Sequence, residues 1–482
     1  MKKKLFILAI SALFSQSLLA QNITQVSVDK MNAVLEKVIA AYGGTDRINQ
    51  LQTMSVNFND SNFAINQSRR PGPPWDENKS SGSSHIDLEQ SIFVTNTKSE
   101  SPNQSFNNSI IISNEKNYQI NNQAKIATPI AQPNFLNTAG PFIRITPIML
   151  VKQLMQRSQA SHYLGQVNID GQNHDVLSLV MEVGPAISLY FDQQNHMLTR
   201  SERYMPAFGL IVYRFINYQE QEGIPFNQSF ELIVNDEINM KRQNLYYKIN
   251  QSIVEQTKLD TSFNVLPIPE PAQPEPLGRQ EIVDGVYLIG GTGTYALFVE
   301  MEDHVIAVGG TAGIPERIQL LKEVLPNKPI KYGVMTHHHD DHILGAQAYA
   351  DQNITVISAE AHEATIRNAT NHPNINFKTI KDKHSFKDKV RNLQLIDIGP
   401  TPHSENILVA YLPDESILFA ADHFGLQSPG NITPAGLNTQ EFAKALKTHQ
   451  IKATKILSAH SPIVATDKDL AQSLKMAQEL NN

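Results

Sequence analysis

The feature that most constrains the fold is the segment at residues 336–342, which directly follows an apolar run at residues 330–335. A short apolar run predicts a buried strand, and the loop that leaves it can direct several side chains toward one point. His337 and His339 alternate along the chain and suit one metal ion, while Asp341 and His342 suit a second ion beside it. The segment therefore predicts a site for two metal ions.

Three more residues of ligand type each follow an apolar stretch further along the chain, namely His403, Asp422 and His460. Chance does not readily place such a residue after each of three predicted strands, so we expect them to complete the site. A histidine-rich loop in solvent is the alternative, and the downstream residues disfavour it. His338 and Asp340, between the motif residues, are expected to point away from the ions.

The block beginning at Thr336 resembles the His-x-His-x-Asp-His signature of the metallo-β-lactamase fold, and the downstream residues extend the resemblance over residues 280–482. The resemblance implies an α/β fold, an αββα sandwich. It also implies a set of zinc ligands: His337, His339 and His403 for the first ion, Asp341, His342 and His460 for the second, and Asp422 between them. The absence of cysteine excludes a thiolate ligand, and iron and manganese are alternative metals.

The same resemblance implies a hydrolase with two zinc ions per chain. In such a site we expect a hydroxide held between the ions to be the nucleophile, and Asp341 would orient it and take its proton. The expected substrate is a small molecule with an ester, lactone, thioester or amide bond. Two features depart from the family pattern: Gly309 and Gly310 end the third strand where many members have aspartate, and Ser461 follows His460 in place of glycine.

The first twenty residues have the pattern of a secretory signal peptide. Three lysines precede an apolar run at residues 5–13, and small residues lead to a cleavage site after Ala20. The apolar run is too short for a membrane anchor, since a bilayer span requires about 20 apolar residues. We therefore expect export, most simply to a bacterial periplasm, and residue 21 is not a cysteine that could carry a lipid.

Residues 21–262 are expected to form a β-rich accessory domain that opens with an amphipathic helix. The helix is predicted at residues 31–42, and a proline-rich stretch at residues 69–84 predicts a flexible loop. The clearest predicted strands lie at residues 187–191, 212–218, 226–234 and 245–249, with a helix capped by Thr146 before them. The region resembles the antiparallel half-barrel of periplasmic lipoprotein carriers, through residues 41–44, 189–192 and 215–218.

A linker is predicted at residues 263–279, because residues 267–276 contain five prolines and such a segment cannot pair as a central strand. After the linker, the sequence pattern changes to one typical of an α/β domain. Residues 286–289, 295–299 and 305–308 predict three strands in a meander, and a helix at residues 315–324 precedes the strand that leads to the histidines. The glycines at residues 290–293 predict a hairpin turn and lack the spacing of a phosphate-binding loop.

The charge balance bears on partners. A formal charge of −7 argues against nucleic acid, and so against a nuclease of the same fold. The alternative from another class is a periplasmic protein that binds a lipid or other hydrophobic ligand and carries a non-catalytic metal domain. No later stretch predicts a membrane span, and the sequence indicates no oligomeric state.

Overall fold

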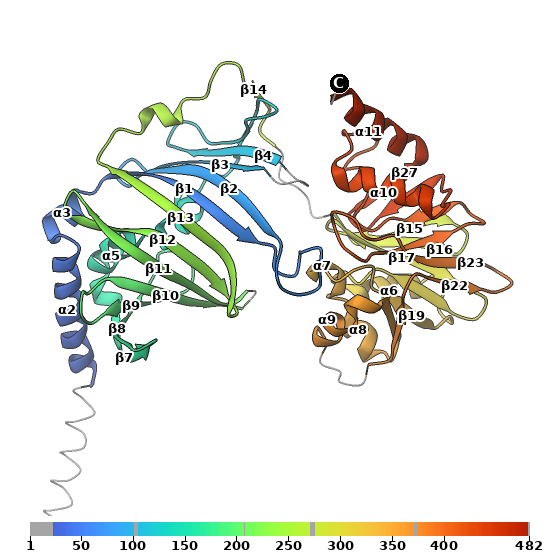
Figure 1. The fold of residues 1–482 in the computed structure, drawn as a ribbon, viewed down its shortest axis with the longest axis horizontal. Coiled ribbons are helices and arrows are strands. Elements are labelled where there is room, and N and C mark those ends of the chain that lie inside the picture. Colours follow the sequence, from blue (N-terminus) through green and yellow to red (C-terminus); the bar gives the residue numbers. More distant parts are fainter. Residues whose placement is uncertain (1–22, 101–104, 207, 270–274, 371–374, 481–482) are drawn as a thin grey trace, which may run out of the picture. The chain divides into compact units, whose positions relative to one another are not determined.

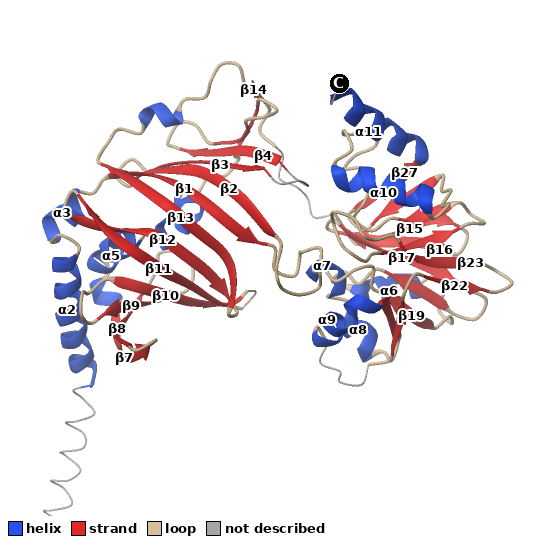
Figure 2. Cartoon of the chain, in the orientation of Figure 1, coloured by secondary structure: helices blue, strands red, loops and turns tan. Residues whose placement is uncertain are grey.

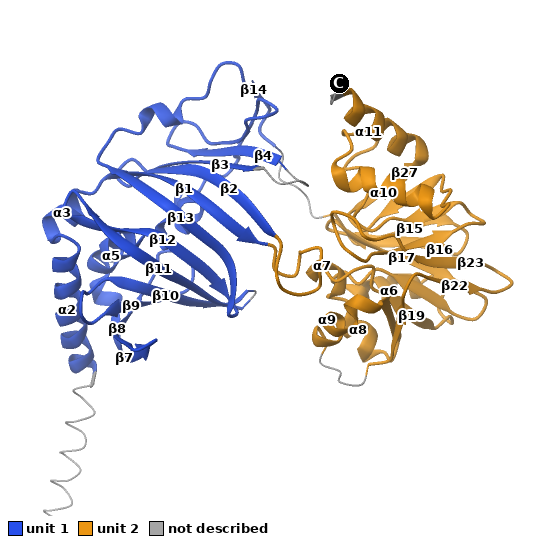
Figure 3. Ribbon diagram, viewed as in Figure 1, with its two compact units in different colours: residues 1–63, 77–100, 105–271 blue, residues 64–76, 101–104, 272–482 orange. Residues whose placement is uncertain are grey.

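The computed structural model describes residues 23–100, 105–206, 208–269, 275–370 and 375–480 (Figure 1). These residues form two compact units (Figure 3). The first contains the described residues of Met1–Phe63, Glu77–Glu100 and Ser105–Pro271, and the second contains Ala64–Asp76 with the described residues of Ala272–Asn482. The predicted signal peptide and residues 270–274 of the predicted linker lie outside the described residues. No described helix combines the length and apolarity that a membrane crossing requires.

The described part of the first unit is built on one 14-stranded sheet (Figure 2). Its pairs are antiparallel except for β14 with β6. The order across the sheet is β14-β6-β5-β4-β3-β2-β1-β13-β12-β11-β10-β9-β8-β7. The strands are β1 (Thr53–Phe63), β2 (Glu77–Asp87), β3 (Ile92–Glu100), β4 (Ser105–Ile112), β5 (Tyr118–Asn121), β6 (Ile126–Pro129), β7 (His162–Ile169), β8 (Gln172–Leu179), β9 (Ile187–Asp192), β10 (Leu198–Met205), β11 (Gly209–Gln221), β12 (Ile224–Val234), β13 (Glu237–Ile249) and β14 (Asn264–Val265).

Helices pack an apolar face against this sheet, and side chains of α2, α4 and α5 share one core with the strands. In α2 the buried residues include Met31, Val34, Leu35 and Val38, at the spacing that predicted an amphipathic helix. Along β1, buried residues alternate with more exposed ones, as expected for a sheet covered on one face. The helices are α2 (Ile23–Ala41), α3 (Thr45–Gln50), α4 (Phe135–Arg144) and α5 (Pro147–Gln156).

The predicted strands of this region lie within β9, β11, β12 and β13, but the prediction of a flexible loop at residues 69–84 is wrong in part. Residues from Glu77 onward form β2, which pairs with β1 and β3. This strand is rich in serine and has no apolar pattern that would predict it. Its backbone hydrogen bonds to the two neighbouring strands hold it in the sheet. Residues 64–76 group with the second unit. α5 begins beside Thr146 as predicted, but the Thr146 hydroxyl donates to the Phe142 carbonyl and does not cap the helix.

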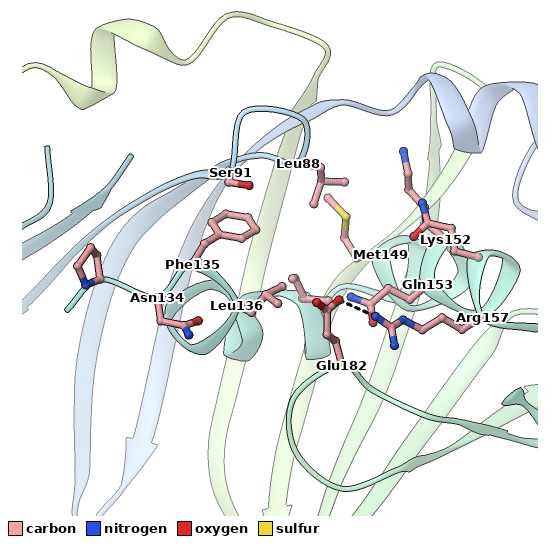
Figure 4. Close-up of a pocket in the computed structure, with 13 residues that line it drawn as sticks. Leu88, Ser91, Asn134, Phe135, Leu136, Met149, Lys152, Gln153, Arg157 and Glu182 are labelled. Atoms are coloured by element: carbon pink, nitrogen blue, oxygen red, sulfur yellow. Dashed lines mark hydrogen bonds and ion pairs between the residues drawn. The ribbon is translucent and has the colours of Figure 1, made fainter. Parts of the chain in front are cut away.

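The first unit contains a cavity of about 590 Å³ beside α4 and α5 (Figure 4). Apolar side chains, including Phe135 and Met149, line part of it. Polar groups line the rest, among them an ion pair between Arg157 and Glu182, whose Nη2 and Oε2 atoms are 2.5 Å apart. The cavity has the size of a site for a small ligand.

The second unit contains two sheets, one seven-stranded and one six-stranded, in its described residues. The seven-stranded sheet runs in sequence order through β15 (Gly278–Val283), β16 (Val286–Gly291), β17 (Thr294–Glu300), β18 (Val305–Val308), β19 (Ile330–Val334), β20 (Thr355–Ala359) and β21 (Phe377–Ile380). The six-stranded sheet also runs in sequence order, through β22 (Lys383–Lys387), β23 (Asn392–Asp397), β24 (Leu408–Leu412), β25 (Ile417–Phe419), β26 (Lys455–Ser458) and β27 (Ser461–Thr466).

The two sheets pack face to face, and helices cover their outer faces. Alternate residues of β16 belong to two different cores: Leu288 to the core shared by both sheets, and Ile289 to the core beneath α6 and α8. Side chains of α10 and α11 pack against the six-stranded sheet. The helices are α6 (Ile314–Lys322), α7 (Asp340–Ile343), α8 (Ala346–Asp351), α9 (Glu363–Asn368), α10 (Leu437–Thr448) and α11 (Asp467–Leu480).

This is the αββα sandwich that the sequence predicted. The meander appears as β16, β17 and β18, and Thr292 and Gly293 form the predicted turn between the first two, with positive φ angles of 52° and 80°. Strands enter the range predicted as a linker from both ends: β14 (Asn264–Val265) lies within it, and β15 (Gly278–Val283) begins in its last two residues. Both strands pair with their neighbours through backbone groups. Pairing of this kind cannot be predicted from amino-acid composition.

Candidate metal centre

The histidine motif lies between the end of β19 and the short helix α7. His337, His339 and His342 are buried, with at most 2 % of each residue exposed. His339 has an extended backbone, with φ −61° and ψ 145°, and α7 begins at the next residue. The change from extended to helical backbone brings the side chains of residues 337, 339 and 342 to one place.

The other predicted residues come from loops of the six-stranded sheet. His403 lies between β23 and β24, Asp422 follows β25, and His460 lies between β26 and β27. The structure brings all seven predicted side chains together, as two groups whose possible ligand atoms all lie within 4.8 Å of one another. The first group is His337, His339, His403 and Asp422, and the second is Asp341, His342, Asp422 and His460.

The distances inside the two groups show that nitrogen and oxygen lone pairs converge. The Nε2 atoms of His337 and His403 are 3.0 Å apart, and those of His342 and His460 are 3.2 Å apart. The Asp422 carboxylate is shared between the groups: Oδ2 lies 3.1 Å from His403 Nε2, and Oδ1 lies 3.0 Å from His342 Nε2. Such a donor set, of imidazole nitrogens and carboxylate oxygens without cysteine, fits zinc.

The opposite ring nitrogens of three histidines are held by partners outside the groups. His337 Nδ1 lies 3.1 Å from Thr336 Oγ1, and His460 Nδ1 donates to the Gly293 carbonyl at 3.3 Å. His339 Nε2 donates to the Ser68 carbonyl at 3.1 Å, and its Nδ1 is buried without a hydrogen-bond partner. Partners of this kind fix the ring orientation and tautomer of metal-binding histidines.

Burial keeps two histidines of the first group, His337 and His339, neutral. It lowers the pKa of His337 well below its ordinary value, and neighbouring His342 acts in the same direction. Burial, followed by the proximity of His403, lowers the pKa of His339 to about 3. Neutral imidazole is the form that binds metal ions, so these rings present free lone pairs at neutral pH.

In the second group the carboxylates attract positive charge. Hydrogen bonds to Asp341 and Asp422 raise the pKa of His460 to about 10. For His342, burial lowers the pKa, but Asp422 and Asp341 outweigh it and raise it to about 9. Burial acts to raise the pKa of Asp341, yet hydrogen bonds from His342 and His460 hold it well below its usual range. A metal cation can supply the positive charge that protons otherwise bring to this group.

Neighbouring histidines have structural partners. His338 Nε2 donates to the Ser68 carbonyl at 2.9 Å, and its Nδ1 lies 3.3 Å from His362 Nε2. His423 is buried, with Nε2 3.2 Å from Thr401 Oγ1. Neither His338 nor Asp340 belongs to either metal-binding group among the described residues.

Close packing explains why a glycine occupies position 310. A Cβ atom there would lie 2.3 Å from the His342 carbonyl oxygen and 2.1 Å from Met335 Sδ. A larger residue would therefore displace the helix that carries His342. The departure from the family pattern at this position is compatible with a complete set of candidate ligands.

Sequence reasoning missed the residues at positions 64–76. Gln67 Nε2 donates to Asp341 Oδ1 at 3.2 Å, and the Ser68 carbonyl accepts from two histidines. No signal in the sequence relates these residues to a motif some 270 positions later, because the main contact is made by a backbone carbonyl that any residue could supply.

A cleft of about 230 Å³ adjoins the second group, with Asp422 and His460 in its wall. Its remaining lining comes from residues between β25 and α10, from the start of α10, from the ends of β26 and β27 that flank His460, and from α11, and it includes Thr433, Thr439 and Ser473. Among the described residues that line it, none is lysine or arginine. The cleft is therefore suited to a small polar group.

Comparison with known proteins gives a family match in this unit. The family described as the metallo-beta-lactamase superfamily matches residues 289–460. Comparison with curated proteins finds no match. The comparisons do not confirm the carrier-like resemblance of the N-terminal half, which stays a prediction.

Solved structures with similarity to the chain include several metallo-β-lactamases. The mono-zinc form of FIM-1 from Pseudomonas aeruginosa is 25 % identical, covers 42 % of this chain and 96 % of its own, and has a TM-score of 0.34. The enzyme from Pontibacter korlensis is 22 % identical, covers 42 % and 99 %, and has a TM-score of 0.35. That from Hirschia baltica is 19 % identical, covers 42 % and 98 %, and has a TM-score of 0.34. The family match thus places the similarity to the metallo-beta-lactamase superfamily within residues 289–460.

Proposed function

We propose that the chain is a hydrolase that uses two zinc ions to cleave an ester, lactone, thioester or amide bond in a small-molecule substrate. The observation that carries the proposal is the position of Asp422, which belongs to both metal-binding groups and suits a carboxylate shared by two ions. In this assignment His337, His339 and His403 would hold one ion, Asp341, His342 and His460 would hold the other, and the Asp422 carboxylate would be shared by both groups.

The reaction would use both the ions and the side chains around them. Bound zinc ions supply a Lewis acid for the scissile carbonyl and lower the pKa of a water molecule toward neutrality. Asp341 is suited to orient the attacking water and accept its proton, because its side chain is 43 % exposed while the neighbouring His342 side chain is fully buried. The cleft beside Asp422 would receive a small polar part of the substrate.

The test is turnover by the zinc-loaded full chain on a panel of chromogenic esters, lactones, thioesters and cephalosporins. We expect His337→Ala to abolish turnover and Asp341→Asn to lower it by about 10²- to 10⁴-fold, the usual contribution of a general base. His449→Ala, at an exposed position after α10, is the matched control and should retain full activity. Unchanged turnover in either site variant, with its metal content measured, would refute the assigned roles.

The cavity of the first unit favours a second candidate, in which the chain binds a hydrophobic ligand and the metal domain is not catalytic. The cavity has room for a small ligand and an apolar wall. Organic extraction of the purified protein and metal analysis separate the two candidates. A chain that contains stoichiometric lipid and zinc but turns over none of the panel would be a binding protein.

We also propose that the protein is exported, with cleavage after Ala20, because its first twenty residues have the pattern of a signal peptide. Expression in a Gram-negative host followed by cell fractionation is the test. The periplasmic fraction should contain a chain whose first residue is Gln21. Recovery of uncleaved chain from the cytoplasm would contradict this expectation.

A further inference from the structure

Residues 64–76 connect two strands of the first unit but belong to the second (Figure 3). In the register of β1 and β2, Phe63 pairs with Glu77, so the two strand ends are adjacent. A hairpin of this kind can be closed by two residues. The segment is therefore much longer than its connection requires, and its length calls for another explanation.

The segment holds itself in one conformation. Its two ends meet through a hydrogen bond from Ala64 N to the Asp76 carbonyl, 2.9 Å long. Ser68, which is fully buried, donates from Oγ to the Ala64 carbonyl at 2.7 Å and accepts from Asp76 N at 2.8 Å. The Asp76 carboxylate accepts from Arg69 N at 2.7 Å. These bonds fix the position of the Ser68 backbone.

The Ser68 carbonyl is fully used by the histidine motif. It accepts from His338 Nε2 at 2.9 Å and from His339 Nε2 at 3.1 Å, which fills both lone pairs of the oxygen. Because His339 carries its proton on Nε2, its Nδ1 is left unprotonated. This nitrogen is buried without a hydrogen-bond partner, so it is the ring nitrogen of His339 that is available to a metal ion in the first group. The carbonyl thus selects the tautomer of His339 that can bind a metal ion.

The same segment contacts the other side of the site. Arg69 Nε donates to the Thr401 carbonyl at 3.2 Å, and the Arg69 carbonyl accepts from Glu405 N at 2.9 Å. These two contacts lie on either side of His403 in the sequence. Gln67 Nε2 donates to Asp341 Oδ1 at 3.2 Å. One segment therefore holds residues from both candidate metal-binding groups.

We propose that residues 64–76 are a working part of the metal centre, with Ser68 as a positioning residue for His339 and Gln67 as a positioning residue for Asp341. The inference rests on the proposed function, because it assigns these contacts to a bound metal. On this view the metallo-β-lactamase segment is completed by residues that precede it by more than two hundred positions.

The test replaces residues 64–76 of the full chain by Asn-Gly, which closes the β1–β2 hairpin with a two-residue turn. Zinc affinity is measured by competition with a chelator, and the site is observed through the visible spectrum of bound Co²⁺. We expect affinity to fall by about 10- to 100-fold, the usual effect of losing such partners, and the Co²⁺ spectrum to change. A replaced chain with the affinity and spectrum of the unaltered protein would overturn the inference.

Two point variants guard against misfolding of the replaced chain. Ser68→Ala removes the hydroxyl that fixes the carbonyl, and Gln67→Ala removes the contact with Asp341. Both should weaken zinc binding and alter the Co²⁺ spectrum, and Gln123→Ala, an exposed glutamine of the first unit, should do neither. Fluorescence of Trp75, the only tryptophan of the chain and part of this segment, reports whether the segment stays in place. Variants with unchanged affinity and spectrum would contradict the inference.

The outcome for the unaltered chain separates the two proposals. If the unaltered chain binds no zinc, the proposed function fails, and the inference fails with it. If the unaltered chain binds two zinc ions and hydrolyses a substrate while all three altered chains do the same with equal affinity, the function holds and only the role of residues 64–76 is refuted.

Discussion

Both units bury a carboxylate among cationic or potentially cationic side chains, and the two surroundings differ. In the first unit Asp60 accepts two hydrogen bonds from Arg242, each 2.7 Å long, and its side chain is 5 % exposed. In the second unit the Asp422 carboxylate lies between 3.0 and 3.6 Å from ring nitrogens of four histidines, and its side chain is 11 % exposed. Asp60 has one partner that satisfies it fully, whereas Asp422 faces several rings that also face one another.

The difference separates stabilising charge from functional charge. A bidentate arginine–carboxylate pair is complete in itself, and the Arg242 guanidinium also lies 3.6 Å from the centre of the Phe58 ring. A group of imidazoles whose Nε2 atoms converge gains nothing by itself from that arrangement. Converging lone pairs become favourable only when a cation lies among them. We therefore expect loss of Asp60 to affect folding and loss of Asp422 to affect chemistry.

The largest expected effect tests this comparison directly. Asp60→Ala should destabilise the first unit by about 3–5 kcal/mol, because it leaves the Arg242 side chain, which is only 12 % exposed, without its partner. Asp422→Ala should abolish zinc-dependent hydrolysis. Denaturant unfolding followed by far-ultraviolet circular dichroism gives the first quantity, and turnover per folded molecule gives the second.

Glu36→Ala, at an exposed position in α2, is the control and should change the free energy of unfolding by less than about 0.5 kcal/mol. The comparison breaks if Asp60→Ala leaves stability unchanged. It also breaks if Asp422→Ala retains turnover at full metal content.

The two units also differ in how many faces of their sheets are covered. In β25 of the second unit, the adjacent residues Ile417 and Leu418 are both fully buried, since the sheet is covered on both faces. In β13 of the first unit, Leu245 is 4 % exposed and its neighbour Tyr246 is 58 % exposed. A strand covered on both faces holds its ends rigidly, which suits a site built from loops that leave those ends.

The next prediction uses these adjacent pairs. Ile417→Ala and Leu418→Ala should each destabilise the second unit by about 2–5 kcal/mol, whereas in the first unit only Leu245→Ala should do so. Tyr246→Ala should stay within about 0.5 kcal/mol. Trp75 fluorescence follows the second unit alone. Circular dichroism follows both units, so the part of its change without a counterpart in fluorescence reports the first. Equal losses at Leu245 and Tyr246 would show that the first sheet is covered on both faces.

The same contrast explains what the sequence could predict. Strands β16, β17 and β18 were predicted because they are continuous apolar runs between turns. The strand β2 was missed, since its serines give no apolar pattern and its position follows from backbone pairing with β1 and β3. Tertiary pairing decided this strand, and composition alone suggested a loop.

The site shows a similar division. The motif and three strand ends predicted that seven side chains would converge, and they do. That they bind zinc stays a prediction. The contacts of Ser68 and Gln67 could not be predicted, because they depend on the path of a distant segment and, for Ser68, on a backbone carbonyl. Side-chain chemistry can be recognised from residue types. A hydrogen bond to a backbone carbonyl cannot, because every residue has such a carbonyl.

A smaller effect is expected from zinc binding, which should change the free energy of unfolding of one unit and not of the other. Zinc at about one hundred times its dissociation constant should stabilise the second unit by about 2.7 kcal/mol and leave the first unit unchanged, since only the folded second unit has the two groups. Denaturant titrations with and without zinc, followed by Trp75 fluorescence and by circular dichroism, measure both shifts. A chain with His342→Ala should show a reduced shift. An equal shift of both transitions would mean that the units unfold as one.

The smallest expected effect concerns how helices begin. In the first unit, Asn134 caps α4, and its side chain accepts from Asn137 N at 2.9 Å. In the second unit, α6 and α10 begin at Gly313 and Gly436, where no side chain can cap the helix. Asn134→Ala should therefore cost the first unit about 1 kcal/mol, and Asn134→Gly only a few tenths. Circular dichroism of the denaturant transition measures both. If alanine and glycine cost the same, the Asn134 side chain does not stabilise α4, and packing alone would hold the helices of both units.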